Sequence, residues 1–169
     1  MTIQIDSREK ARAISKILKT FDDNNVKHYV SKLFVGDYMN LDNPRLVVDR
    51  KQSLLELANN VCQDHERFRR EIVRANENGI HLIFLCEHGQ GVECLEDLPF
   101  WKNPRREVRI RTGNGWATIE TKAITGETLY KILSTMERKY GVEFLFCRKE
   151  ETGIKIIELL NDDSRRDKE

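Results

Sequence analysis

The chain has 169 residues, about the length of one domain, which is enough to bury a substantial core. Its 29 basic and 28 acidic side chains nearly cancel, which excludes a general attraction to nucleic acid and leaves such attraction to local patches. No stretch approaches the roughly 20 apolar residues that span a bilayer, and the amino terminus lacks the regions of a signal peptide. We therefore expect a cytoplasmic or otherwise intracellular protein without membrane contact. The four cysteines include no Cys-x-x-Cys pair, which argues against a zinc site.

The first thirty residues predict a strand, a helix and a second strand. Residues 3–5 form a short alternating strand that delivers Asp6 to the start of the helix. The apolar side chains of the helix recur at i, i+3, i+4 and i+7, and they are Ile14, Ile17, Leu18 and Phe21. Asn24 and Asn25 end it. The alternation at residues 26–30 is typical of an exposed edge strand.

A hairpin is expected between a corner at Gly36 and the apolar run of residues 46–48. Residues 41–44, with the sequence Leu-Asp-Asn-Pro, are typical of its turn. Folding the chain about the third of these residues places Asp37 directly opposite Asp49, with their Cβ atoms roughly 5 Å apart.

The hairpin brings acidic and basic side chains together. Because side chains alternate along a strand, Asp49 and Lys51 share one face and Arg50 points to the other. Two carboxylates as close as Asp37 and Asp49 repel each other unless a cation lies between them, so the pattern favours a bound metal. An isolated Asp-x-Lys is more often a solvated charge cluster at a strand end.

Two helices and a buried strand follow the hairpin. Ser53 and Glu56 form the Ser-x-x-Glu capping box of the first helix. The second helix begins at about Asp64 and stops at Gly79. Residues 80–86 are a nearly continuous apolar run, which indicates a strand covered on both faces.

The second helix carries a basic stripe. Arg67, Arg70 and Arg74 lie at i, i+3 and i+7, on the side opposite the apolar residues, and we expect Glu71 to pair with Arg67. The stripe is interpreted either as a contact with DNA phosphates or as an ordinary solvated helix face.

Residues 89–125 are interpreted as an insertion that is rich in glycine and basic residues. Tryptophans flank its basic stretch, which comprises Lys102, Arg105, Arg106, Arg109 and Arg111. Basic side chains neutralise phosphates and aromatic rings stack on unpaired bases, so Trp101 and Trp116 would suit branched or single-stranded DNA. The alternative is a hairpin packed on the sheet.

The remaining chain predicts a helix from about Thr128, a strand at 142–147 and a helix at 153–160. Together the elements predict an α/β fold with a mixed β-sheet flanked by helices. Residues 1–160 form one domain, and residues 161–169 form a charged tail.

Three short motifs occur in a fixed order. They are Asp6-Ser7-Arg8-Glu9, Gly36-Asp37-Tyr38 and Asp49-Arg50-Lys51, the last followed by Ser53 and an apolar helix. This order resembles the nuclease domain of the XPF-type structure-specific endonucleases, and the resemblance covers roughly residues 3–88. It implies a restriction-endonuclease-like fold and a nuclease that acts on DNA.

The resemblance also implies roles for the motif residues. Asp37 and Asp49 would bind Mg²⁺ or Mn²⁺, because hard cations prefer oxygen ligands. Lys51 would contact the attacking water and the phosphate oxygens, and Asp6 and Glu9 would form an outer acidic pair that holds a metal-bound water or a second ion. Asp6 and Glu9 could instead be acids that the dipole favours at the amino terminus of a helix. The family usually has Glu at the position of Asp49, but related metal nucleases accept either acid.

Arg8 and Arg50 belong to the same motifs and are assigned to DNA binding, although the face of Arg50 also suits a structural or partner-binding role. We expect a Mg²⁺-dependent endonuclease that cuts flap or fork DNA, and the alternative is a catalytically silent DNA-binding or scaffolding subunit. Family members dimerise, so we also expect a homodimer through the apolar face of the last helix, formed by Ile154, Ile157 and Leu160.

Overall fold

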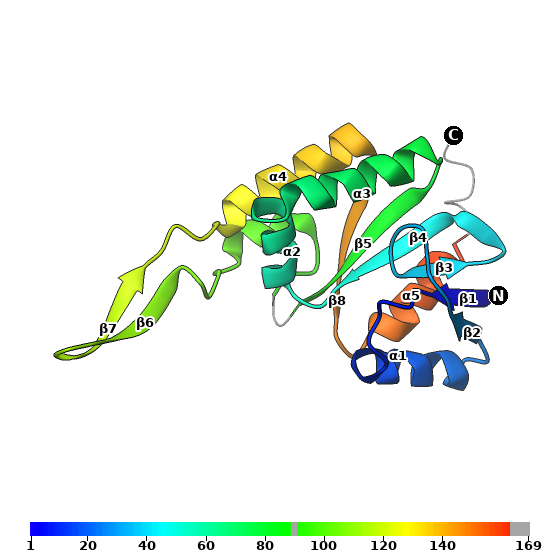
Figure 1. Cartoon of the computed structure of the whole chain (residues 1–169), viewed down its shortest axis with the longest axis horizontal. Coiled ribbons are helices and arrows are strands. Elements are labelled where there is room, and N and C mark those ends of the chain that lie inside the picture. Colours follow the sequence, from blue (N-terminus) through cyan, green and yellow to red (C-terminus); the bar gives the residue numbers. More distant parts are fainter. Residues whose placement is uncertain (89–90, 163–169) are drawn as a thin grey trace.

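The computed structural model describes residues 1–88 and 91–162, so most of the predicted tail lies outside the described residues. Six strands form the central sheet in the order β2-β1-β3-β4-β5-β8 (Figure 1). They are β1 (Thr2–Ile5), β2 (Lys27–Val30), β3 (Tyr38–Asn40), β4 (Asn43–Lys51), β5 (His81–His88) and β8 (Glu143–Arg148). β3 runs antiparallel to β1 and β4, whereas the other neighbours are parallel. The predicted mixed sheet is confirmed.

Helices cover both faces of the sheet (Figure 1). On one face, which we call the three-helix face, lie α2 (Leu54–Cys62), α3 (His65–Glu77) and α4 (Gly126–Tyr140). On the two-helix face lie α1 (Ala11–Asp23) and α5 (Thr152–Leu160). Each face has its own apolar core, and β5 contributes alternate residues to both, as expected for a strand that is buried on both sides.

The β3–β4 hairpin places the acidic residues nearly as the sequence predicts. Tyr38 pairs with Val48, so the register continues to bring Asp37 opposite Asp49. The turn itself is shorter than expected, because Asn43 and Pro44 already belong to β4 and the pairing shifts register near Asn40. The irregularity preserves the predicted alignment of the two carboxylates.

Local signals define the helix ends. Ser53 Oγ accepts from Glu56 N at 3.1 Å as the expected cap of α2, but the Glu56 carboxylate returns to Gln52 N and not to Ser53 N. Gly79 has a φ of 62°, the left-handed conformation in which glycine commonly ends a helix such as α3.

The insertion has two parts. The 3₁₀ helix η1 (Leu95–Phe100) packs on α4, and Leu98 there is fully buried. Strands β6 (Glu107–Thr112) and β7 (Gly115–Glu120) form a separate two-stranded sheet that projects away from the body (Figure 1). The insertion therefore contains a hairpin, but the alternative interpretation, in which this hairpin packs on the sheet, is wrong.

The last helix is buried more deeply than the sequence suggested. α5 packs on α1 and the two-helix face, where Ile156, Leu159 and Leu160 are buried. Of the residues expected at a dimer interface, only Ile154 is exposed. The apolar face of α5 is thus used within the chain, because α4 and α5 cover opposite faces of the sheet.

No helix among residues 1–88 and 91–162 has both the length and the apolar character that crossing a bilayer requires.

Candidate active site

The end of β4 divides its side chains between the two faces of the sheet. Val47 belongs to the core of the three-helix face and Val48 to that of the two-helix face. The alternation continues, so Asp49 and Lys51 lie on the three-helix face and Arg50 on the other. This part of the sequence interpretation is confirmed.

Asp37 is held at the corner between the loop and the hairpin. Its backbone N–H donates to Val48 O at 2.9 Å, and its Oδ2 accepts from Arg50 N at 2.8 Å. Gly36, with a φ of 65°, makes the corner possible, because a side chain there would overlap Val47 Cγ1. The tight corner presses Asp37 against the strand that carries Asp49.

Asp49 and Lys51 form a buried ion pair. Lys51 Nζ lies 2.5 Å from Asp49 Oδ1, a buried oxygen that has no other donor beside it among the described residues. The ammonium also lies 5.5 Å from the ring centres of Phe68 and Phe84. These rings fix Lys51 beside the carboxylate.

Burial and neighbouring negative charges raise the pKa of both aspartates above the ordinary value. Burial raises the pKa of Asp49 to about 6, against the opposing influence of Lys51 and with a further increase from the charge of Glu71. Burial also raises the pKa of Asp37 well above its usual value, and the charges of Asp49 and Glu9 add to it. The pair is therefore short of positive charge.

Lys51 remains a cation. Burial lowers the pKa of this ammonium, but the carboxylates of Asp49, Asp37 and Glu71 raise it more, and the net pKa lies above the usual value. A lysine in this state supplies positive charge and does not accept a proton.

The first acidic motif is placed differently from its predicted role. Asp6 is completely buried and accepts from Arg8 N, Arg8 Nε and Leu33 N at 2.6–2.8 Å. Burial raises the pKa of Asp6, but these hydrogen bonds outweigh burial and hold it below the usual value. Both oxygens are thus used to fix the loop before Gly36, and the assignment of Asp6 to metal binding stays a prediction that this geometry does not support.

Glu9 and Arg50 belong to a charge network on the two-helix face. Arg50 donates to Glu9 Oε2 at 3.0 Å and to Glu87 Oε1 at 2.7 Å. Glu87 Oε1 also accepts from the Thr152 hydroxyl at 3.0 Å, and Tyr38 donates its hydroxyl to Glu9 at 2.9 Å. Because Arg50 is buried and lies between two carboxylates, its role in this structure is to hold β4, β5 and the start of α1 together, and its assignment to DNA binding stays a prediction.

The sequence analysis did not assign two acidic residues of this region to the site. Glu71 was expected to pair with Arg67, but it accepts a hydrogen bond from Gly36 N at 3.3 Å and its charge acts on Asp49. Glu87 directly follows the apolar run of β5, as Asp49 follows that of β4, and this position was the available signal.

The donor set suits a hard cation. Asp37 and Asp49 offer carboxylate oxygens, one of them buried and contacted by no donor but Lys51 among the described residues, and the surrounding charge is negative. Residues 1–88 and 91–162 contain no group of three or more His, Cys, Asp or Glu side chains already arranged around a metal position. Two aspartates with open coordination could hold an ion that also binds water and phosphate.

The basic residues assigned to DNA binding lie in three places. Arg67, Arg70 and Arg74 are exposed on α3, where Arg74 lies over the ring of Phe34. Arg105 and Arg106 are attached to the body through Asn59 Oδ1 and Ala123 O. Lys102 is exposed, and Arg109 lies on the projecting hairpin, 5.7 Å from the ring centre of Trp116.

The projecting hairpin has two unlike faces. Cross-strand neighbours share a face, so Arg109, Arg111 and Trp116 lie together on one side, with Glu107 and Glu120 at its base. The other side carries the exposed apolar residues Val108, Ile110 and Ile119. Trp116 is 66% exposed, which leaves its ring available to a ligand.

Comparison with known proteins agrees with the motifs. The family model described as the ERCC4 domain matches residues 5–160. The structure is similar to XPF from Aeropyrum pernix, with a TM-score of 0.64 and 20% identity over 98% of this chain and 66% of that one. A second structure, XPF from the same organism in complex with DNA, gives a TM-score of 0.62 and 18% identity over 98% of this chain and 69% of that one.

The chain thus spans about two thirds of the length of these proteins. A search among curated proteins gave no match to the sequence. The family match covers nearly all of the sheet and every motif from which the resemblance to XPF-type nucleases was drawn, apart from the first residues of β1. The resemblance is confirmed, and the chain belongs to the ERCC4 domain family.

Proposed function

We propose that the chain is a divalent-metal-dependent endonuclease that hydrolyses phosphodiester bonds in branched DNA. The observation that carries this proposal is the convergence of Asp37, Asp49 and the cationic Lys51 on one face of the sheet at the end of β4. The family match and the likeness to XPF structures, one of them bound to DNA, support the same activity.

Asp37 and Asp49 would hold Mg²⁺ or Mn²⁺, and when bound the ion would polarise the scissile phosphate and lower the pKa of a water ligand. Hydrolysis forms a bond from a water oxygen to phosphorus and breaks the bond to the leaving oxygen. Lys51 contributes its positive charge where negative charge accumulates in the transition state. The surrounding aromatic rings and ion pairs fix it in advance.

The basic surfaces would hold the DNA. The exposed arginines of α3 suit phosphate contacts, and the Arg109–Trp116 side of the hairpin combines a cation with an open aromatic ring. An arm of this kind can reach DNA beyond the cleavage site, which favours a flap or fork over a plain duplex. The predicted homodimer would have to use surfaces other than the buried face of α5, and light scattering at tens of micromolar protein would test it.

A silent DNA-binding subunit is the second candidate. The observation that favours it is the Lys51–Asp49 ion pair, which already neutralises one of the two aspartates without any metal. In that case the chain would bind DNA and cut none.

Labelled flap, fork, Holliday-junction and linear duplex DNA should be incubated with the protein in Mg²⁺, Mn²⁺ or EDTA. We expect cleavage of flaps or forks with either metal and none in EDTA. Binding without cleavage in both metals would support the silent subunit, and equal cleavage of all four substrates would contradict the branched specificity. Asp49→Asn in the same reactions identifies contaminating nuclease.

A further inference from the structure

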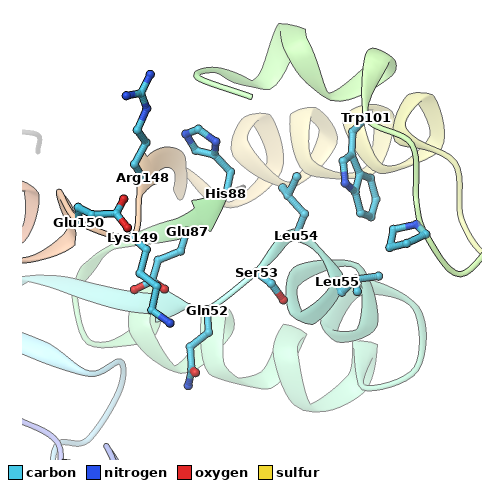
Figure 2. A pocket seen from close by; sticks show the side chains of 11 residues that line it. Gln52, Ser53, Leu54, Leu55, Glu87, His88, Trp101, Arg148, Lys149 and Glu150 are labelled. Carbon is cyan, nitrogen blue, oxygen red and sulfur yellow. The ribbon is translucent and has the colours of Figure 1, made fainter. Parts of the chain in front are cut away.

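A cavity of about 480 Å³ opens beside the candidate active site, at the carboxyl ends of β4, β5 and β8 (Figure 2). Gln52 and Ser53 line it, and they follow Lys51 directly along the chain. Of the residues considered above for metal or DNA binding, Trp101 alone lines this cavity. Its volume lies in the range of small-molecule binding sites.

The two sides of the cavity differ in chemistry. Trp101, Leu54 and Leu55 form an apolar side together with Pro104. Arg148 and Lys149 stand on the opposite side next to Glu150, as Figure 2 shows. These three groups sum to one positive charge, and the charge of Glu87, which also lines the cavity, is paired with Arg50. This balance suits a single phosphodiester better than a polyphosphate.

The residues at the end of β5 have unsatisfied polar atoms. Glu87 Oε2 and His88 Nδ1 are buried and have no hydrogen-bond partner within the described part of the chain, and both residues line the cavity. A buried polar atom without a partner is costly. A ligand that carries donors and acceptors could satisfy these atoms after a small rotation of either side chain.

We propose that this cavity takes one unpaired nucleotide of a DNA strand. The base would stack on Trp101 and use its edge groups toward Glu87 and His88, and the phosphate would face Arg148 and Lys149. The inference rests on the proposed function, because the strand must pass the active site to arrive at Gln52. A paired base cannot enter, so the cavity would favour a junction where a strand has separated from its duplex.

Tryptophan fluorescence can test the pocket directly. The chain has two tryptophans, so the Trp116→Phe protein reports on Trp101 alone. It should be titrated in EDTA with a ten-nucleotide single strand, a fork with unpaired arms, a blunt duplex and free deoxynucleoside monophosphates. We expect saturable quenching by the single strand and the fork and none by the duplex. Free monophosphates should quench only at much higher concentration, since they lack the backbone contacts of a strand.

Matched variants separate stacking from folding. Trp101→Ala should weaken binding of the fork by about 5- to 150-fold and leave the duplex unchanged, and Trp101→Phe should restore most of the loss. Phe100→Ala is the control, because Phe100 is the preceding residue, is 83% exposed and does not line the cavity. Thermal unfolding of each variant checks the fold.

The outcomes distinguish this inference from the proposed nuclease. Cleavage of forks in Mg²⁺ by a protein whose Trp101 is not quenched would overturn the pocket and leave the nuclease intact. Selective quenching by a protein that cuts no DNA would support the pocket and remove the nuclease. Equal quenching by duplex and single strand, or equal loss of both in Trp101→Ala, would overturn the pocket.

Discussion

Lys51 lies two positions after Asp49 on strand β4, and its Nζ is 2.5 Å from Asp49 Oδ1. Within residues 1–88 and 91–162, Lys51 is the one cationic side chain that forms an ion pair with either Asp37 or Asp49. The charge balance of the site is incomplete without a cation, which is why the roles of these residues can be tested both by activity and by stability.

Replacing either aspartate should remove cleavage and preserve binding. Asp37→Asn and Asp49→Asn each take away a metal-binding charge, and we expect the cleavage rate to fall by roughly 10²-fold or more. Fork binding should be equal or tighter, because a negative charge near the phosphate is gone. Single-turnover cleavage and fluorescence anisotropy measure the two effects, with Asp23→Asn at an exposed site as the control. Wild-type cleavage by either variant would refute that residue's role.

The stability of the protein should depend on the ionisation of Asp49. Its pKa is about 6 in the fold and 3.8 ordinarily, so the folded state binds the proton more tightly. The stabilisation of the folded state by the proton on Asp49 is complete below pH 3.8 and is lost as the pH rises through about 6. Between about pH 4 and about pH 8, Asp49→Asn should gain stability relative to the wild type by up to about 3 kcal/mol.

Urea unfolding at a series of pH values measures this difference. In the same experiment Mg²⁺ should stabilise the wild type above pH 7, because an ion that binds the folded state stabilises it. It should have little effect on Asp49→Asn, which lacks a carboxylate to bind the ion. A pH-independent difference between the two proteins would show that Asp49 titrates normally.

Gly36 should tolerate no side chain. Gly36→Ala combines a φ of 65° with an overlap on Val47 Cγ1, and we expect the free energy of unfolding to fall by roughly 2 to 4 kcal/mol. Cleavage activity should be lost as well, since the corner positions Asp37. Gly79→Ala is a matched control, because Gly79 has a φ of 62° but open space around its Cβ. Its loss should be about 1 kcal/mol, with activity retained. Equal losses in denaturant unfolding would mean that the overlap is relieved at no cost.

The projecting hairpin should contribute to DNA affinity without contributing to the stability of the body. Arg109→Ala with Arg111→Ala should weaken binding of every substrate and lower the salt dependence by about one log-log unit per lost phosphate contact. Trp116→Ala should cost roughly 1 to 3 kcal/mol on flaps or single strands and almost nothing on blunt duplex. Anisotropy titrations at several salt concentrations measure both, and unchanged slopes and affinities would leave the hairpin without a role in DNA binding.

Arg105 and Arg106 serve as the comparison in that experiment. Their guanidinium groups donate to Asn59 and to the backbone of Ala123, at the base of the insertion. Their replacement by Ala should therefore reduce the thermal stability of the region as well as DNA binding.

Much of the site could be predicted because it depends on local rules. The shared face of Asp49 and Lys51 follows from the strand repeat, and the approach of Asp37 follows from the register of one hairpin. Glu71 was assigned wrongly because helix spacing gives the neighbours on its own helix, whereas its partner Gly36 comes from a loop 35 residues away.

Longer-range packing explains the remaining errors. The pattern of α5 predicts an apolar stripe, but the chain alone does not show that α4 and α5 lie on opposite faces and that Leu160 is therefore buried within the protein. The alternation of the β6–β7 hairpin likewise indicates two faces without showing that both remain exposed.

The central claim is that Asp37 and Asp49 bind the metal that makes cleavage possible. The most direct measurement is the single-turnover cleavage rate of a labelled fork as Mg²⁺ is titrated from EDTA to saturation, for the wild type and for the double variant Asp37→Asn with Asp49→Asn. We predict no cleavage in EDTA, a saturable increase for the wild type, and no response of the double variant, which still binds the fork. Cleavage that persists in EDTA, or a double variant that responds to Mg²⁺ as the wild type does, would contradict the claim.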